Sequence, residues 1–137
     1  MEDIRKYIRA VPNFPKPGIQ FYDLTTLLED PAGFRAALGA METYGRSRQP
    51  NKIVGIEARG FVFGGALADR MQLPLIVVRK PGKLPAATES QEYQLEYGSD
   101  SVEIHRGTIQ EDDRVLIVDD LIATGGTVRA AVDLVRR

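Results

Sequence analysis

The sequence is poor in the residues from which many catalytic and metal sites are built. Its 137 residues include no cysteine and a single histidine, His105. The chain can therefore form neither disulfide bonds nor thiolate metal sites, and a zinc site or catalytic triad based on histidine is not expected. No apolar run is long enough to cross a membrane, and Met1–Arg5 lack the pattern of a signal peptide. We expect a cytoplasmic protein with no membrane partner.

A charge excess of either sign is also missing. The chain has 18 Lys and Arg against 19 Asp and Glu, a formal net charge of −1, so no basic field favours binding to nucleic acid. Hydrophobic residues make up 43% and charged residues 27%, as in ordinary soluble globular proteins. Because the sequence has no repeats, low-complexity segment or linker, we predict a single domain over residues 1–137 with a core of its own.

One stretch near the end of the chain combines a strand, two acids and a helix start. Val115–Val118 is an apolar run rich in β-branched residues, which predicts a buried parallel strand. Asp119 and Asp120 follow it, and apolar residues at helical spacing begin after a short loop. In an open α/β sheet, ligands bind in the crevice at the carboxyl ends of the strands. The sequence therefore predicts a ligand site here.

The loop before this predicted helix has the composition of a phosphate-binding loop. Gly125 and Gly126 allow backbone N–H groups to approach an anion closely, and the helix N-terminus adds a partial positive charge. Thr124 and Thr127 add hydroxyl donors. A plain strand–turn–helix with Thr124 near an N-cap is the alternative interpretation. The complete pattern favours the phosphate site over that alternative.

The two aspartates cannot help to bind a phosphate, because like charges repel. Asp119 and Asp120 suit vicinal hydroxyls or a hydrated Mg²⁺ instead, and a phosphate beside a diol indicates a ribose 5-phosphate. No lysine follows the glycines, as a Walker loop requires, and no G-x-G-x-x-G is present. The stretch from Val115 to Thr127 resembles the phosphoribosyl-pyrophosphate (PRPP) motif of the type I phosphoribosyltransferases.

The remaining pattern is typical of an α/β domain. Strand, helix, strand, polar excursion, strand and helix follow one another, which predicts a parallel sheet covered by helices. No strand follows the last predicted helix, so we expect a C-terminally incomplete domain in which one edge of Val115–Val118 is unpaired and recruits another chain. The other expected elements are a helix over Ile4–Val11, a loop over Pro12–Gly18, a helix that starts at Asp30 and Pro31, a loop over Gly45–Asn51, strands at Lys52–Glu57 and Leu75–Val78, a helix over Phe61–Met71, and a hairpin within Thr88–Gly107 that turns at Gly98–Asp100.

Two cationic segments follow the first two predicted strands of the sheet. Arg59 can chelate phosphate oxygens with two parallel hydrogen bonds, and Gly60 permits a close approach of the backbone. Arg79–Lys83 places three cations around a Pro-Gly pair. Each segment alone would be an ordinary surface feature. Together with the phosphate loop, they indicate a ligand that carries both a monophosphate and a pyrophosphate.

Further segments resemble the adenine phosphoribosyltransferase family in order and spacing, namely Phe14–Ile19, Gly55–Phe61, Arg79–Pro85 and Leu95–Gly98. The resemblance implies the type I phosphoribosyltransferase fold, with a central parallel sheet flanked by helices and a flexible hood hairpin. Leu84–Gly107 is the candidate for that hood, which would act as a lid over the reactants. The resemblance also implies a homodimer that converts adenine and PRPP to AMP and pyrophosphate with Mg²⁺, in purine salvage. Tyr22 stands where the family often has Arg or Lys.

The same resemblance implies a role for individual residues. The Glu57–Ala58 peptide bond is expected to be cis. Mg²⁺ is expected to bind mainly to PRPP, with water molecules between the ion and the two aspartates. The implied contacts are Ala123, Thr124, Gly125, Gly126 and Thr127 with the 5′-phosphate; Arg59, Lys80 and Lys83 with pyrophosphate; Gln20, Phe21 and Leu121 with adenine; and Glu96, Tyr97, Asp119 and Asp120 as catalytic residues around the reacting ribose.

Two other functions would use the same phosphate sites, and a folded but inactive truncated chain is a third alternative. An enzyme for another base, such as hypoxanthine, xanthine or orotate, would differ in the hood and the N-terminal segment. A regulator that senses PRPP without catalysis would normally need a DNA-binding module, and the sequence has no basic patch for one. An enzyme that acts on adenine is the interpretation we favour.

Overall fold

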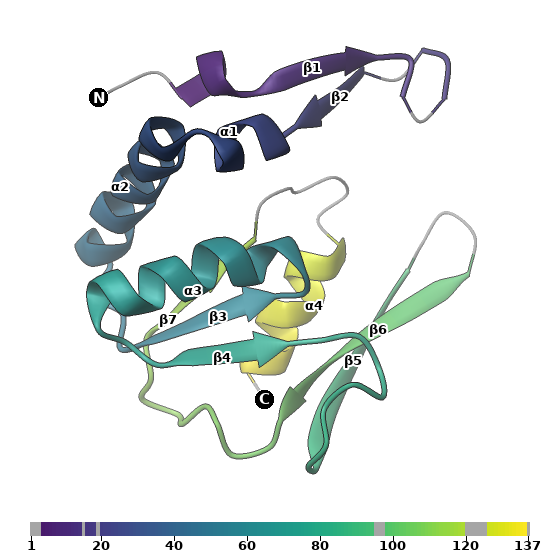
Figure 1. Cartoon of the computed structure of the whole chain (residues 1–137). Coiled ribbons are helices and arrows are strands. Elements are labelled where there is room, and N and C mark those ends of the chain that lie inside the picture. The colour runs from purple at the N-terminus through teal and green to yellow at the C-terminus, as the bar shows by residue number, and fades with distance from the viewer. Residues whose placement is uncertain (1–3, 15, 19, 95–97, 120–125, 137) are drawn as a thin grey trace. The chain divides into compact units, whose positions relative to one another are not determined.

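The computed structural model describes residues 4–14, 16–18, 20–94, 98–119 and 126–136. The chain divides into two compact units, Met1–Tyr44 and Gly45–Arg137, and the single domain over residues 1–137 stays a prediction. In chain order the elements are a 3₁₀ turn η1 (Ile4–Tyr7), β1 (Arg9–Pro12), β2 (Gln20–Asp23), α1 (Thr25–Glu29), α2 (Pro31–Ser47), β3 (Lys52–Ile56), α3 (Arg59–Met71), β4 (Leu75–Val78), β5 (Thr88–Gln94), β6 (Ser99–His105), β7 (Val115–Val118) and α4 (Gly126–Val135) (Figure 1).

The first unit begins with a hairpin rather than a helix. The helix predicted over Ile4–Val11 is wrong, because only the turn η1 forms there and the following residues enter β1. Strand β1 pairs antiparallel with β2, from Arg9 opposite Asp23 to Pro12 opposite Gln20. A helix of fewer than about 12 residues is marginal on its own. Pairing across the Pro- and Gly-rich turn therefore overrides the short helical pattern.

The start of α2 follows its sequence signals. The Asp30 carboxylate accepts hydrogen bonds from the backbone N–H groups of Ala32, at 3.0 Å, and Gly33, at 3.2 Å. These bonds satisfy two of the N–H groups that a helix start leaves unpaired, and Pro31 occupies the first helical position. The helix then runs to Ser47, beyond the predicted start of the loop at Gly45.

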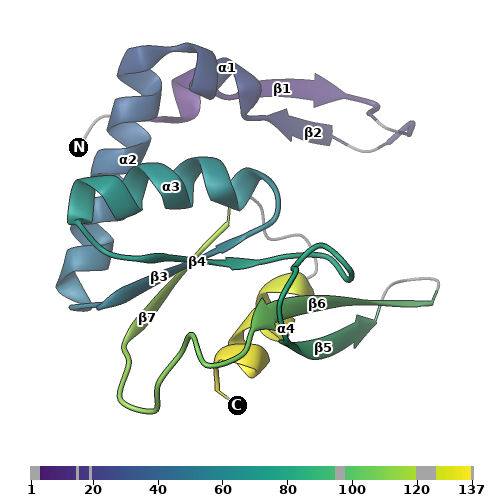
Figure 2. The same ribbon diagram turned by 60° about the horizontal axis from the view of Figure 1, so that its bottom comes forward.

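The second unit contains the predicted parallel sheet, in the strand order β4-β3-β7. Strand β3 is central, and its residues Ile53 to Ile56 are all buried, as expected for a strand covered on both faces. Helix α3 packs on one face, and α4 with the β5–β6 hairpin covers the other (Figure 2). The prediction of a central parallel sheet flanked by helices is therefore confirmed.

One hydrophobic core of this unit lies on the hairpin side of the sheet. It joins alternate residues of the strands to the hairpin and to α4, which explains why the hairpin is held close to the sheet. Its buried members are Val54, Ile56, Val78, Val102, Ile104, Ala131 and Leu134.

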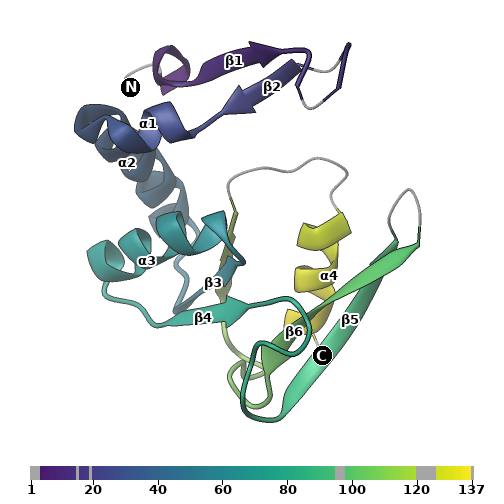
Figure 3. The ribbon, with the colours of Figure 1, turned by 45° about the vertical axis from the view of Figure 1, so that its right-hand side comes forward.

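The hairpin forms as predicted, but the predicted position of its turn is wrong. Ser99 and Asp100 were expected in the turn, yet they belong to β6 and pair with Gln94 and Tyr93 of β5. Gly98 just before them has a φ of +88°, a backbone conformation that favours glycine. Figure 3 shows the hairpin beside α4.

Strand β7 lies at one edge of the sheet. Within the described part of the chain it pairs with β3 alone, in register from Lys52 opposite Val115 to Gly55 opposite Val118. The expected unpaired edge is therefore present among these residues. No helix in the described ranges has the length and apolar character needed to span a membrane.

Candidate active site

The three parallel strands end at one edge of the sheet. Ile56 of β3 lies opposite Val78 of β4, and Gly55 lies opposite Val118 of β7. The segments that follow these strands therefore start side by side, at the carboxyl end of the sheet (Figure 1). The cations predicted to bind pyrophosphate and the two aspartates predicted to bind ribose come from these three segments or from the start of α3, which follows β3 closely.

Two of these segments approach each other closely at Gly60 and Asp119. A Cβ atom built on Gly60 would lie 2.7 Å from the carbonyl oxygen of Val118, and 3.4 Å from both Cα and Oδ1 of Asp119. Real Cβ atoms do not approach backbone oxygen so closely, so only glycine fits here. The start of α3, which carries Arg59, therefore lies directly against the first predicted ribose-binding carboxylate.

Glu57 organises the cationic segment after β4. One carboxylate oxygen accepts hydrogen bonds from Nε of Arg79, at 3.1 Å, and from the backbone N–H of Lys80, at 3.0 Å. The other lies 3.4 Å from Nζ of Lys83. Burial would raise the pKa of Glu57, but the bonds from Lys80 and Arg79 and the Lys83 charge lower the pKa below its ordinary value. Glu57 thus stays ionised and fixes the segment.

Sequence reasoning missed this role of Glu57. The residue was read as the end of a strand, and its partners lie more than twenty positions away in the chain. One signal was present, because Glu57 is an acid at the end of a buried strand in a protein with a cationic loop after the next strand. The Glu57–Ala58 peptide bond is cis, as the resemblance implied.

The two lysines of this segment have different surroundings. Nζ of Lys80 donates to the Tyr93 hydroxyl and to Oδ2 of Asp100, both at 2.9 Å. The side chain of Lys83 is 51% exposed, and that of Lys80 is 42% exposed. Arg59 is exposed at the first position of α3. The structure therefore brings Lys80 and Lys83 together on one short segment, with part of each side chain open to water.

Only part of the predicted phosphate loop lies within the described residues. Gly126 and Thr127 are the first two residues of α4, so the predicted helix starts where the phosphate site requires it. Gln20 and Phe21 lie in β2 of the first unit, and Gln20 is exposed. The remaining predicted site residues fall outside the described ranges, namely Glu96, Tyr97, Asp120, Leu121, Ala123, Thr124 and Gly125.

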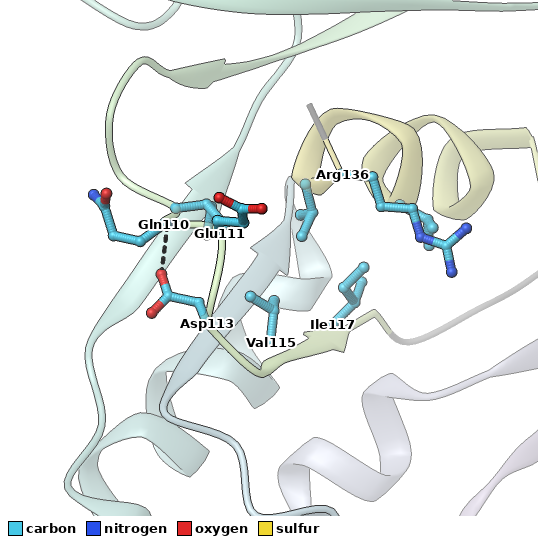
Figure 4. Close-up of a pocket in the computed structure, with 9 residues that line it drawn as sticks. Gln110, Glu111, Asp113, Val115, Ile117 and Arg136 are labelled. Carbon is cyan, nitrogen blue, oxygen red and sulfur yellow. Dashed lines mark hydrogen bonds between the residues drawn. The ribbon is translucent and has the colours of Figure 1, made fainter.

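A separate hollow lies at the edge of β7, away from these segments. Its lining includes Val115 and Ile117 of β7, Arg136 near the end of α4, and the acids Glu111 and Asp113 (Figure 4). Two carboxylates and one guanidinium do not suit a polyphosphate. Across the described ranges, no three His, Asp or Glu side chains gather into a group that could hold a metal ion.

Comparison with known proteins identifies the family. Residues 23–137 match the model of the phosphoribosyl transferase domain. An adenine phosphoribosyltransferase of Parvibaculum lavamentivorans is 54% identical over 135 residues, which cover 98% of this chain and 77% of that protein. The chain belongs to the adenine phosphoribosyltransferase family. It is therefore an enzyme of the transferase class.

Solved adenine phosphoribosyltransferase structures share the fold. The enzyme of Thermoanaerobacter pseudethanolicus matches with a TM-score of 0.90 at 49% identity, over 96% of this chain and 77% of that chain. The Saccharomyces cerevisiae enzyme, solved with an imino-altritol bisphosphate and adenine, matches with a TM-score of 0.90 at 38% identity over the same shares. The adenine phosphoribosyltransferase fold thus applies to nearly the whole chain.

Proposed function

We propose that this chain transfers the 5-phosphoribosyl group of PRPP to adenine and releases pyrophosphate, so that adenine is salvaged as AMP. One observation on the structure of this chain supports the proposal most directly. The Asp119 carboxylate and the cations of the Arg79–Lys83 segment follow the two strands that flank β3, at the same end of the sheet. A site with opposite charges on its two sides suits a reaction that separates charge.

The reaction itself explains why both charges are needed. The bond between the anomeric carbon and the pyrophosphate oxygen breaks, and its electron pair leaves with pyrophosphate. Positive charge builds on the ribose until a ring nitrogen of adenine forms the new bond and loses its proton. Asp119 and Asp120 stabilise the developing positive charge, and Arg59 and Lys83 stabilise the leaving pyrophosphate, to which the resemblance also assigns Lys80.

The remaining contacts follow from the same proposal. The 5′-phosphate binds to the segment from Ala123 to Thr127, where the start of α4 presents backbone N–H groups. Adenine lies between Phe21 and Leu121, with Gln20 near its exocyclic amine. Glu96 and Tyr97 belong to the hairpin that covers the reacting bond and excludes water, which would otherwise hydrolyse the activated sugar. Bound adenine in the yeast relative supports a base site of this kind.

Magnesium fits the residues present as an ion held mainly by the substrate. Asp119 presents a carboxylate beside Gly60 at the edge of the site, and Mg²⁺ prefers oxygen ligands and keeps several waters. Asp119 and Asp120 would hold the ion through water, next to the ribose hydroxyls. The ion supplies positive charge to the pyrophosphate oxygens.

We further propose a cytoplasmic homodimer. Within the described residues β7 pairs with β3 alone, and an apolar strand edge tends to recruit another chain. This edge and the dimer surface that the resemblance implies are the two candidate contacts. Light scattering should give a dimer or a larger species at micromolar concentration. A strict monomer under those conditions would contradict this part of the proposal.

A base-competition assay tests the function. The purified protein is incubated with PRPP, Mg²⁺ and one radiolabelled base at a time, and the nucleotide product is separated. We expect AMP from adenine and little product from hypoxanthine, xanthine or orotate. A different preferred base would indicate a related enzyme, and PRPP binding without any product would indicate a regulator. Absence of PRPP binding would refute the site itself.

A further inference from the structure

Lys80 is bound to the β5–β6 hairpin from the end of β4. Its Nζ donates to the hydroxyl of Tyr93 and to the carboxylate of Asp100, each at 2.9 Å. The ammonium group also lies 5.6 Å from the centre of the Tyr93 ring, within reach of a cation–π interaction. One side chain therefore connects the segment after β4 to both strands of the hairpin.

The two partners occupy a defined level of the hairpin. Tyr93 and Asp100 are paired across β5 and β6, and only the pair Gln94 and Ser99 separates them from residues 95–98. The hairpin is thus held at its penultimate pair of residues. Glu96 and Tyr97, the predicted catalytic residues of the hairpin, are joined to these two strands by short stretches of chain.

The bonding of Lys80 is that of a structural cation. An ammonium group has three N–H donors, and two of them go to the hairpin. The hydrogen bonds that Lys80 donates to Tyr93 and Asp100 raise the pKa of Lys80, and the bond from Lys80 lowers the pKa of Asp100. Lys83, by contrast, lies 3.4 Å from a carboxylate oxygen of Glu57, and its side chain is more exposed than that of Lys80. Lys83 is therefore the better placed of the two for a polyphosphate.

We propose that Lys80 is a positioning residue, which ties the β5–β6 hairpin to the end of β4 through Tyr93 and Asp100, rather than a direct ligand of pyrophosphate. The inference rests on the proposed phosphoribosyl transfer, and it gives Lys80 a role different from the one that the resemblance implied. Tyr93 and Asp100 become positioning residues for the same reaction.

A second connection makes the idea testable by side-chain substitution. Arg79 and Glu103 exchange backbone hydrogen bonds of 3.0 and 2.8 Å, and the Glu103 carboxylate accepts the Gly82 N–H at 3.0 Å. These bonds hold the backbone of the segment beside β6 without any help from the Lys80 side chain. Replacing Lys80 should therefore loosen the hairpin near Tyr93 and Asp100 without unfolding the segment.

The experiment compares Lys80→Met, Tyr93→Phe and Asp100→Asn with the wild-type chain. We expect kcat to fall about tenfold in Lys80→Met and Asp100→Asn, and less in Tyr93→Phe, because misplaced groups cost rate. The affinity for inorganic pyrophosphate should stay within about twofold, since no ligand contact is lost. The double variant of Lys80 and Asp100 should be no slower than either single variant. Lys80→Arg should recover part of the rate.

Glu89→Gln is the matched control. Glu89 is also a hairpin carboxylate in an ion pair, 3.1 Å from Nε of Arg106, but it lies towards the other end of β5. The control removes one carboxylate charge, as Asp100→Asn does, and should leave kcat unchanged. Hydrogen exchange adds a readout that needs no activity, and amides near Tyr93 and Ser101 should exchange faster in Lys80→Met than in Glu89→Gln.

The outcomes separate this inference from the proposed function. A loss of pyrophosphate affinity of about tenfold or more in Lys80→Met, with Asp100→Asn unchanged in rate, would make Lys80 a direct ligand and overturn the inference. A wild-type chain that makes no AMP would refute the proposed function instead. In that case hydrogen exchange decides the positioning role alone, and equal exchange in Lys80→Met and wild type would overturn it.

Discussion

The two ends of the parallel sheet use the same residue types in different ways. At the amino end, Nζ of Lys52 lies 2.6 Å from Oδ2 of Asp113 and donates to the Thr108 carbonyl at 2.8 Å. The side chains of Lys52 and Asp113 are only 20% and 6% exposed. At the carboxyl end, those of Lys80 and Lys83 are 42% and 51% exposed. The exposure of the lysine side chains, not residue type, distinguishes the structural end from the functional end.

The acids differ between the two ends as well. Asp113 also accepts hydrogen bonds from the Gln110 N–H, at 2.6 Å (Figure 4), and from the side chain of Asn51, at 2.8 Å. Its bonds therefore close within the protein. Glu57 at the carboxyl end likewise binds three donors, but these belong to a segment whose lysines reach solvent. A closed network stabilises the fold, and the open one presents cations to a ligand. The hollow beside Asp113 therefore does not compete as the active site.

The largest expected effect comes from the start of α4. Gly126→Val should reduce PRPP affinity by about 100-fold or more, because a β-branched side chain would restrict the backbone and fill the anion site. Calorimetry measures the affinity. Gly65→Val in α3 is the control, since a Cβ at Gly65 meets nothing within 4 Å, and it should bind PRPP normally. Unchanged affinity in Gly126→Val would remove the phosphate loop from the account.

The next largest effect should come from removing the charge of either aspartate that follows β7. Asp119→Asn and Asp120→Asn should each lower kcat by about 100-fold, as for loss of one charge-stabilising group. The midpoint of urea unfolding should change little, because the role of these acids is in the reaction. Full activity in both variants would show that the ribose assignment is wrong.

The contact between Gly60 and Asp119 should be sensitive to a single methyl group. Gly60→Ala should destabilise the fold by about 1–3 kcal/mol through overpacking and lower kcat, because the new Cβ would meet the Val118 carbonyl at 2.7 Å. In the same helix Gly65→Ala should be neutral or should stabilise by up to about 1 kcal/mol. Denaturant unfolding and the AMP assay on both variants measure the difference. Equal behaviour of the two would contradict the close approach.

The smallest expected effect on activity belongs to the amino end. The Lys52 bond, helped by the Gln110 N–H and Asn51, lowers the pKa of Asp113 from 3.8 to about 2. A carboxyl group whose pKa is lowered by folding stabilises the fold at any pH above its pKa in the unfolded chain. This stabilisation is lost as the pH falls towards the pKa in the folded state. Asp113→Asn should thus be less stable than wild type at pH 7, and the difference should vanish as the pH approaches about 2. Its kcat at pH 7 should be unchanged.

A constant stability difference between pH 7 and pH 2 would contradict this role of Asp113. A large loss of kcat in Asp113→Asn, with the fold intact, would contradict the division between the two ends of the sheet.

Much of the second unit could be predicted because its signals are local. The apolar runs at β3, β4 and β7 each act within a few residues, and in the first unit the same holds for Asp30 before Pro31. The prediction of a helix over Ile4–Val11 was wrong because a helix this short is only marginally stable, and part of the segment pairs with β2 as a strand instead. The bonds of Glu57 to Arg79 and of Lys80 to Asp100 could not be predicted, since their partners are brought together only by the fold. The family's motifs supplied the site roles that no local pattern indicated.

One measurement tests the division between the two ends most directly. Amide chemical shifts of the ¹⁵N-labelled protein are followed by NMR while PRPP and Mg²⁺ are added. We predict saturable shifts at the carboxyl end, at Gly60, Lys83, Asp119 and Gly126, and none at Asn51, Gln110 and Asp113. Shifts confined to the second group, or spread evenly over both, would contradict the assignment of the active site to the carboxyl end of the sheet.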